Sequence, residues 1–158
     1  MDAASRPVSE IMQTDFVTVS LHDRLDFADQ VMRLGRIRHL PVLHHGRVVG
    51  IISNRDILAA SLTKVLQFGP IERRAFLRSV DVEEVMTSRI HTVSTGATLA
   101  EAAELLLRHK IGCLPVVDPA GIPVGLVTET DLLRAAFLAE EPEARPHGAA
   151  ASAPAGGS

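Results

Sequence analysis

The chain has 158 residues, of which 46% are hydrophobic and 22% are charged, so it is long and apolar enough to form a folded core. The net charge is −3 and only 3% of the residues are aromatic, which argues against binding to nucleic acid or to an anionic membrane. No run of about 18 apolar residues and no secretory signal is present. The single cysteine excludes an internal disulfide and fits a reducing compartment. We therefore expect a cytoplasmic protein.

Within each half of the chain, hydrophobic periodicity predicts the element order β-α-β-β-α. Helices are indicated where apolar residues recur every three to four positions, and hairpins where two short apolar runs flank a turn. The elements are, in chain order, a short strand at 16–19, a helix at 23–35, strands at 40–43 and 47–53, a helix from Ser53, a strand at 90–93, a helix at 98–109, strands at 114–117 and 123–128, and a helix from Thr128.

These two halves are copies of one repeat. VSEIMQTDFVTVS from Val8 matches VEEVMTSRIHTVS from Val82, 74 positions later, and the LPV of residues 40–42 recurs at 114–116 with the same offset. After one inserted residue, the GIISNRD of residues 50–56 matches GLVTETD 75 positions later. Each copy has about 50 residues and is too short to bury its apolar face alone, so we expect the copies to pack on each other.

The segments outside the repeats have their own patterns. Residues 61–80 are too many for an unstructured loop and predict helices that break at Gly69-Pro70. Beyond Glu141 the sequence is rich in Pro, Ala, Gly and Ser without apolar periodicity, which predicts disorder. The predicted organisation is a first repeat at 8–60, a helical connector at 61–81, a second repeat at 82–138 and a disordered tail at 139–158.

The strand-to-helix junctions carry the most informative motif, G-x-x-S/T-x-x-D, at Ser53/Asp56 and at Thr128/Asp131. One interpretation is a capping box, in which the hydroxyl and the carboxylate satisfy free N–H groups of the first helical turn. The other is a nucleotide site, because a helix N-terminus attracts phosphate and a carboxylate can accept both hydrogen bonds from a ribose diol. Capping boxes are the more common of the two, and the sequence leaves both interpretations open.

The repeated pattern also resembles a protein family. The openings VSEIM and VEEVM, the strands RHLPV and GCLPV, and the two G-x-x-S/T-x-x-D motifs are similar in order to a tandem pair of cystathionine β-synthase (CBS) domains, the Bateman module. The resemblance covers Val8 to about Leu138. It implies an α+β fold of two β-α-β-β-α repeats with pseudo-two-fold symmetry. It also implies a regulatory module that binds AMP, ADP, ATP or S-adenosylmethionine between the repeats, with no obligatory cofactor.

Carried over by position, the resemblance implies that Ser53 and Thr128 face phosphate or ribose, and that Asp56 and Asp131 face the ribose diol. The first repeat is richer in arginine near its motif, whereas the second has Glu129 opposite Asn54, so we expect the first pocket to prefer phosphate-rich ligands. The other implied contacts line or flank the adenine pockets, mainly through backbone and aliphatic groups: Thr18, Arg38, His39, Leu40, Arg55, Thr92, Ile111, Cys113 and Leu114.

The remaining features predict no further chemistry. The pair His44-His45 lacks partners at metal-ligand spacing, and Cys113 has no activating neighbour in the sequence, so we expect no metal site and no nucleophile. Common catalytic motifs are absent, so we expect no enzymatic activity.

The three leucines at 105–107 span too wide an arc for one sheet to cover, and together with the resemblance they predict a homodimer. An unidentified protein would be the regulated partner. The alternative function is a ligand-free dimerisation or docking scaffold.

Overall fold

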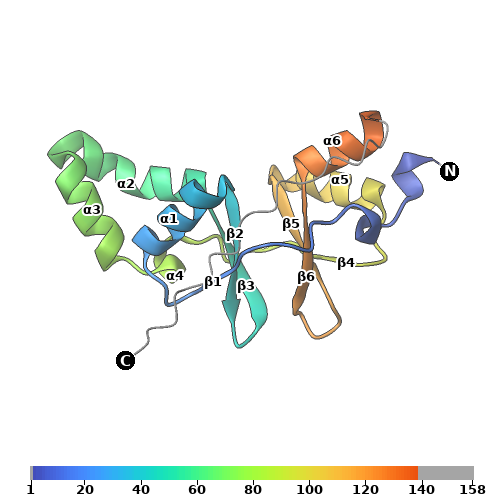
Figure 1. Ribbon diagram of the computed structural model, residues 1–158, viewed down its shortest axis with the longest axis horizontal. Coiled ribbons are helices and arrows are strands. Elements are labelled where there is room, and N and C mark those ends of the chain that lie inside the picture. The colour runs from blue at the N-terminus through green and yellow to red at the C-terminus, as the bar shows by residue number, and fades with distance from the viewer. Residues whose placement is uncertain (1, 139–158) are drawn as a thin grey trace, which may run out of the picture.

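The computed structural model describes residues 2–138, with the side chains of residues 63–65 and 68 excepted. Two three-stranded sheets lie side by side, with helices on one side and hairpin turns at the other end (Figure 1). The predicted α+β class is confirmed. The elements of the first half are η1 (Ala3–Ser5), η2 (Val8–Glu10), β1 (Val19–Ser20), α1 (Leu25–Gly35), β2 (His39–His44), β3 (Arg47–Ser53), α2 (Asn54–Phe68), α3 (Pro70–Ser79) and α4 (Val82–Val85).

The second half repeats the arrangement of the first. In each sheet a two-residue strand pairs in parallel with the middle strand, which pairs antiparallel with the last strand, and both hairpins contain one register shift. We call the sheet β1–β3 with α1–α4 the first lobe, and the sheet β4–β6 with α5, α6, η1 and η2 the second lobe. The elements of the second half are β4 (Val93–Ser94), α5 (Leu99–His109), β5 (Cys113–Val117), β6 (Pro123–Thr128) and α6 (Glu129–Phe137).

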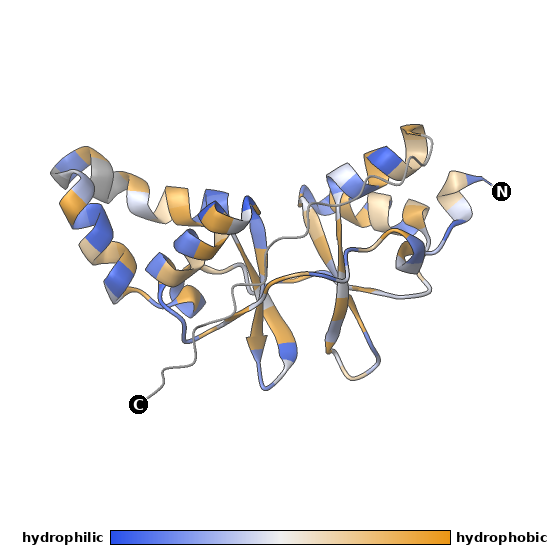
Figure 2. Cartoon of the chain, in the orientation of Figure 1, coloured by the Kyte–Doolittle hydropathy of each residue, from blue (hydrophilic) through white to orange (hydrophobic). Residues whose placement is uncertain are grey.

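Capping residues and left-handed residues mark the ends of several helices. Helix α5 starts with a capping box formed by Thr98 and Glu101, which satisfies N–H groups of its first turn. Helices α1 and α5 both stop at a left-handed residue, Arg36 and Lys110, with φ of 52° in each case. The strands are the most apolar segments of the chain (Figure 2), and they form the centre of each lobe. Periodicity therefore predicts the helices and hairpins to within two residues.

The short first strands differ from the prediction. The sequence predicts them at 16–19 and 90–93, but β1 and β4 begin at Val19 and Val93 and pair over only two residues each. The residues before them belong to segments that run from one lobe to the other (Figure 1), so they have no neighbouring strand with which to pair. An extended segment without a partner is not a strand.

The two repeats exchange their opening segments. Val8 is fully buried in the core of the second lobe, and Val82 is fully buried in the core of the first. Backbone bridges join Gln13 to Leu126 and Thr87 to Ile51, which fixes each opening segment against the last strand of a sheet. Each lobe therefore contains residues from both repeats.

A methionine–glycine contact accompanies each exchanged segment. A Cβ atom at Gly125 would lie 2.5 Å from Sδ of Met12, and a Cβ atom at Gly50 would lie 2.5 Å from Sδ of Met86. The glycine of each G-x-x-S/T-x-x-D motif thus makes room for a methionine of the opposite opening segment. Its role in this structure is packing, which the sequence motif alone did not indicate.

The connector is helical, and its break lies where the sequence predicts it. Helix α2 continues through residue 60 to Phe68, Gly69 has a φ of 95°, and Pro70 is the first residue of α3. Leu77 of α3 is 2% exposed and completes the core of the first lobe. The repeat boundary at 60 stays a prediction, because α2 runs across it. The tail at 139–158 lies outside the described residues.

Candidate functional site

Both strand-to-helix junctions form capping boxes. At α2 the Asp56 N–H donates to Ser53 Oγ at 3.1 Å, and the Ser53 N–H donates to Asp56 Oδ2 at 2.9 Å. At α6 the Asp131 N–H donates to Thr128 Oγ1 at 3.3 Å, and the Thr128 N–H donates to Asp131 Oδ2 at 2.9 Å. The capping interpretation is confirmed at both places. A role in ligand binding would use the acceptor capacity that remains.

That remaining capacity differs between the two aspartates. Asp131 also accepts from the Thr128 hydroxyl at 3.0 Å and from Gln13 Nε2, which lies 3.2 Å from Oδ1 and 3.0 Å from Oδ2. Among the described residues, Oδ1 of Asp56 accepts no hydrogen bond. No sequence motif indicates this role of Gln13. The available signal was that Gln13 aligns with Thr87, a different polar residue directly after a matched methionine.

His39 lies where the two lobes meet. A Cβ atom at Gly112 would lie 3.2 Å from both Cε1 and Nε2 of the imidazole, so only a glycine leaves this contact unstrained. Burial lowers the pKa of His39, and the charges of Arg38 and Arg55 act in the same direction, while Asp56 and Glu129 oppose them. The structure therefore brings residues of both predicted pockets into one electrostatic environment.

Several predicted pocket residues are part of the hydrophobic cores. Leu40 and Leu114 are fully buried, so they can offer a ligand only their backbone. Ile111 is partly buried against the core of the second lobe. Cys113 is a free, buried cysteine, and burial, with a contribution from Asp131, raises the pKa of its thiol to about 12. A thiol with such a pKa is protonated at neutral pH and is not a nucleophile.

Arg38 and Arg55 are exposed, as a role in binding phosphate would require. The Arg38 carbonyl accepts from the Asn54 N–H at 2.9 Å, which places Arg38 directly before the first turn of α2. The equivalent bond in the second lobe joins the Glu129 N–H to the Gly112 carbonyl at 3.2 Å. The residue whose carbonyl accepts from the first helical N–H is thus Arg38 in the first lobe and Gly112 in the second. The helix itself begins with Asn54 in the first lobe and with the acidic Glu129 in the second.

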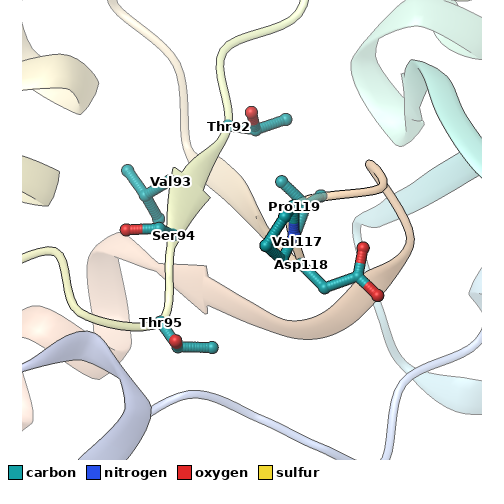
Figure 3. A pocket seen from close by; sticks show the side chains of 7 residues that line it. All are labelled: Thr92, Val93, Ser94, Thr95, Val117, Asp118 and Pro119. Atoms are coloured by element: carbon teal, nitrogen blue, oxygen red, sulfur yellow. The ribbon is translucent and has the colours of Figure 1, made fainter.

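A cavity of about 280 Å³ lies at the end of β4 and β5. In Figure 3, Thr92, Ser94 and Thr95 lie on one side of it, and Asp118 and Pro119 on the other. Thr92 is the one predicted site residue that lines this cavity. Oδ1 of Asp118 accepts from two turn N–H groups, those of Ala120 and Ile122, at 2.9 Å each, so this carboxylate shapes the hairpin turn. Thr18, the counterpart of Thr92, is partly buried.

Residues 2–138 contain neither a candidate metal site nor a candidate membrane-spanning helix. No group of three or more His, Cys, Asp or Glu side chains there is arranged to hold a metal ion. No helix in the same range is long and apolar enough to cross a membrane.

The order of elements, the two junctions and the repeat register agree with a known family. The CBS domain model matches the chain twice, at residues 8–63 and 82–137. The chain belongs to the CBS domain family. Its two CBS domains form a tandem pair, as the sequence resemblance implied.

A curated relative has nearly the same length. The chain is 32% identical over 136 residues to a CBS domain-containing protein of Dictyostelium discoideum, covering 85% of this chain and 94% of the relative. Other relatives are much longer: the chain spans 30%, 24% and 46% of three of them.

Two solved CBS structures contain nucleotides or nucleosides. The CBSX2 structure in complex with AMP has a TM-score of 0.66 and 28% identity, and the match covers 82% of this chain and 95% of that chain. The CBS domain pair of protein MJ0100, in complex with 5′-methylthioadenosine and S-adenosyl-L-methionine, has a TM-score of 0.65 and 25% identity, covering 82% and 94%.

Proposed function

We propose that this CBS pair is a regulatory module that binds an adenosine-containing ligand, namely AMP, ADP, ATP or S-adenosylmethionine. The observation that carries the proposal is Oδ1 of Asp56 at the start of α2, which accepts no hydrogen bond from the described residues and to which a ribose diol can donate. The adenosine compounds bound by the related pairs support the same ligand class. The module would act in the cytoplasm on a separate protein, and its own role would be non-enzymatic.

Different protein groups are proposed to contact the ribose, the phosphate and the adenine of the ligand. Asp56 accepts from the ribose, Ser53 and the first turn of α2 face the phosphate or ribose, and Arg38 and Arg55 contribute positive charge. Backbone groups around Leu40 and the side chain of Thr18 would border the adenine. If the second pocket held a ligand, Thr128 and Asp131 would bind it in the same way, with Thr92 beside the adenine.

A thermal-shift experiment tests the ligand class. The purified chain is unfolded with AMP, ADP, ATP, S-adenosylmethionine and, as a control, GTP, each at millimolar concentration. A ligand present at 100 times its dissociation constant stabilises the folded state by about 2.7 kcal/mol, which raises the unfolding temperature measurably. A shift with an adenosine compound and none with GTP is expected. No shift with any of them would favour the alternative of a ligand-free scaffold.

We also propose that the chain forms a homodimer through α5 and α6. A groove of about 620 Å³ lies between these helices and η1, and its lining is mostly apolar. Leu107, Leu133 and Phe137 on its border are 79%, 59% and 79% exposed. In the first lobe, α3 packs on the equivalent helices α1 and α2, so there this chain itself covers part of the same face. The uncovered face needs an occupant.

The occupant we propose is a second copy of the chain. Helix α2 carries Leu58, Leu62 and Leu66 at spacings of four residues, with exposures of 55%, 48% and 77%, so the chain has an apolar ridge as well as a groove. Two copies related by a two-fold axis can place the ridge of each copy in the groove of the other. Both ridges and both grooves of the dimer are then covered.

A further inference from the structure

The backbone of Gln13 is fixed beside the last strand of the second lobe. Its N–H donates to the Leu126 carbonyl at 2.8 Å, and its carbonyl accepts from the Leu126 N–H at 2.9 Å. The preceding residue, Met12, packs over Gly125. These contacts hold residue 13 next to the start of α6. Its side chain is therefore already close to Asp131, and little conformational freedom is lost when the two form a hydrogen bond.

The side chain of Gln13 occupies both oxygens of Asp131. Its Nε2 lies 3.2 Å from Oδ1 and 3.0 Å from Oδ2. An ionised carboxylate only accepts hydrogen bonds, so the nitrogen of the amide must face it. Oδ2 accepts in addition from the N–H and the hydroxyl of Thr128. A ribose diol would need the same two oxygens.

Thr87, at the equivalent position in the first lobe, does not occupy the carboxylate of Asp56. Thr87 is bridged to Ile51 by N–H···O distances of 2.9 and 3.0 Å, so its backbone is held as that of Gln13 is. Its shorter side chain makes no hydrogen bond to Asp56, and among the described residues the carboxylate of Asp56 accepts only from the Ser53 N–H. One residue difference between the repeats therefore decides which carboxylate is available.

We propose that Gln13 takes the place of the ribose diol at Asp131, so that the chain binds one adenosine ligand, at Asp56. The inference rests on the proposed function and names which of its two pockets operates. A ligand entering the second pocket must displace a charge-assisted hydrogen bond from a donor that is already in position. Residue 13 is therefore a specificity-determining position that converts a two-site repeat into a one-site module.

Exchanging the two residues tests the inference. Calorimetric titration with adenosine avoids repulsion between phosphate and Glu129, and unfolding temperatures without ligand check the fold of each variant. We expect one site per chain in the wild type and a second site in Gln13→Thr. Thr87→Gln should weaken binding at Asp56 tenfold or more, which corresponds to about 1.4 kcal/mol. The double exchange should move the site to the second lobe, where Asp131→Asn abolishes it.

Three results would overturn the inference. The first is a wild type that binds at both aspartates, and the second is a Gln13→Thr variant that folds normally and gains no site. The third is binding of wild-type strength in Thr87→Gln. If neither the wild type nor any variant binds adenosine or a nucleotide, the proposed function itself fails together with the inference. If the wild type binds at Asp56 but the exchange changes nothing, only the role of Gln13 fails.

Discussion

His39 lies against Gly112 at the junction of the two lobes, so closely that a Cβ atom on residue 112 would come within 3.2 Å of two imidazole atoms. The imidazole also lies in the fields of Asp56, Glu129, Arg38 and Arg55. A single side chain thus links the packing of the lobes to the charges at both junctions. Its protonation should affect the stability of the whole pair.

Stability should fall with acidification because of His39. Burial lowers its pKa in the folded state, so the unfolded chain binds the proton more tightly. The contribution of the neutral imidazole is fully present above the unfolded pKa of about 6.5 and is lost as the pH falls through the folded pKa. Urea unfolding of the wild type and of His39→Gln between pH 8 and 5 measures this. The stability difference between the two proteins should change below pH 6.5, and a difference that is independent of pH would contradict the prediction.

Gly50 should be intolerant of even one added methyl group. In Gly50→Ala the new Cβ atom would meet Met86 and, at 3.1 Å, the Thr87 carbonyl oxygen, so we expect a loss of about 1–3 kcal/mol from overpacking. Gly96→Ala is the matched control, because a Cβ atom there has no neighbour within 4 Å. It should change stability by less than about 0.5 kcal/mol. Equal effects of the two substitutions in chemical unfolding would disprove the packing role of Gly50.

Arg55 should distinguish phosphorylated from unphosphorylated ligands. We expect Arg55→Ala to weaken ATP binding about tenfold, because a guanidinium forms charge-assisted contacts with phosphate, while adenosine affinity stays constant. The loss should shrink as salt is raised, since exposed charges are screened over about 8 to 10 Å at physiological ionic strength. Titration calorimetry with both ligands measures this. Equal losses for ATP and adenosine would assign Arg55 to the fold or to the adenosine pocket.

The groove between α5 and α6 should control the oligomeric state. Leu107→Glu places a charge in the groove and should convert the dimer to a monomer, as measured by light scattering at tens of micromolar. Leu34→Glu on α1 is a matched control, because both leucines are 79% exposed but only Leu107 lines the groove. A wild type that is already monomeric would remove the prediction. A dimer that survives Leu107→Glu would place the interface elsewhere.

The sequence predicts those features that depend on neighbouring residues. The stripe that includes Leu25, Ala28 and Met32 is buried as periodicity requires, and Gly69-Pro70 separates two helices. The hydroxyl–aspartate pairs form the predicted caps. Each of these depends on contacts within a few residues along the chain, and such contacts can be read from spacing alone.

The features that the sequence did not predict depend on contacts between distant segments. Nothing in the residues around Val8 indicates that it joins the core of the second lobe, because an apolar residue fits either core equally well. The bond between Gln13 and Asp131 spans 118 positions and follows from that exchange. The repeat alignment shows that Gln13 differs from Thr87, but only the exchanged fold gives the difference a consequence.

The most direct test of the account is titration calorimetry of AMP and ATP into the wild type, Asp56→Asn and Asp131→Asn. Asparagine keeps one oxygen for the helix cap, so either substitution should cost on the order of 1 kcal/mol of stability or less. We predict one site per chain in the wild type, loss of binding in Asp56→Asn and wild-type affinity in Asp131→Asn. Unchanged binding in Asp56→Asn, or loss of binding in Asp131→Asn alone, would contradict it.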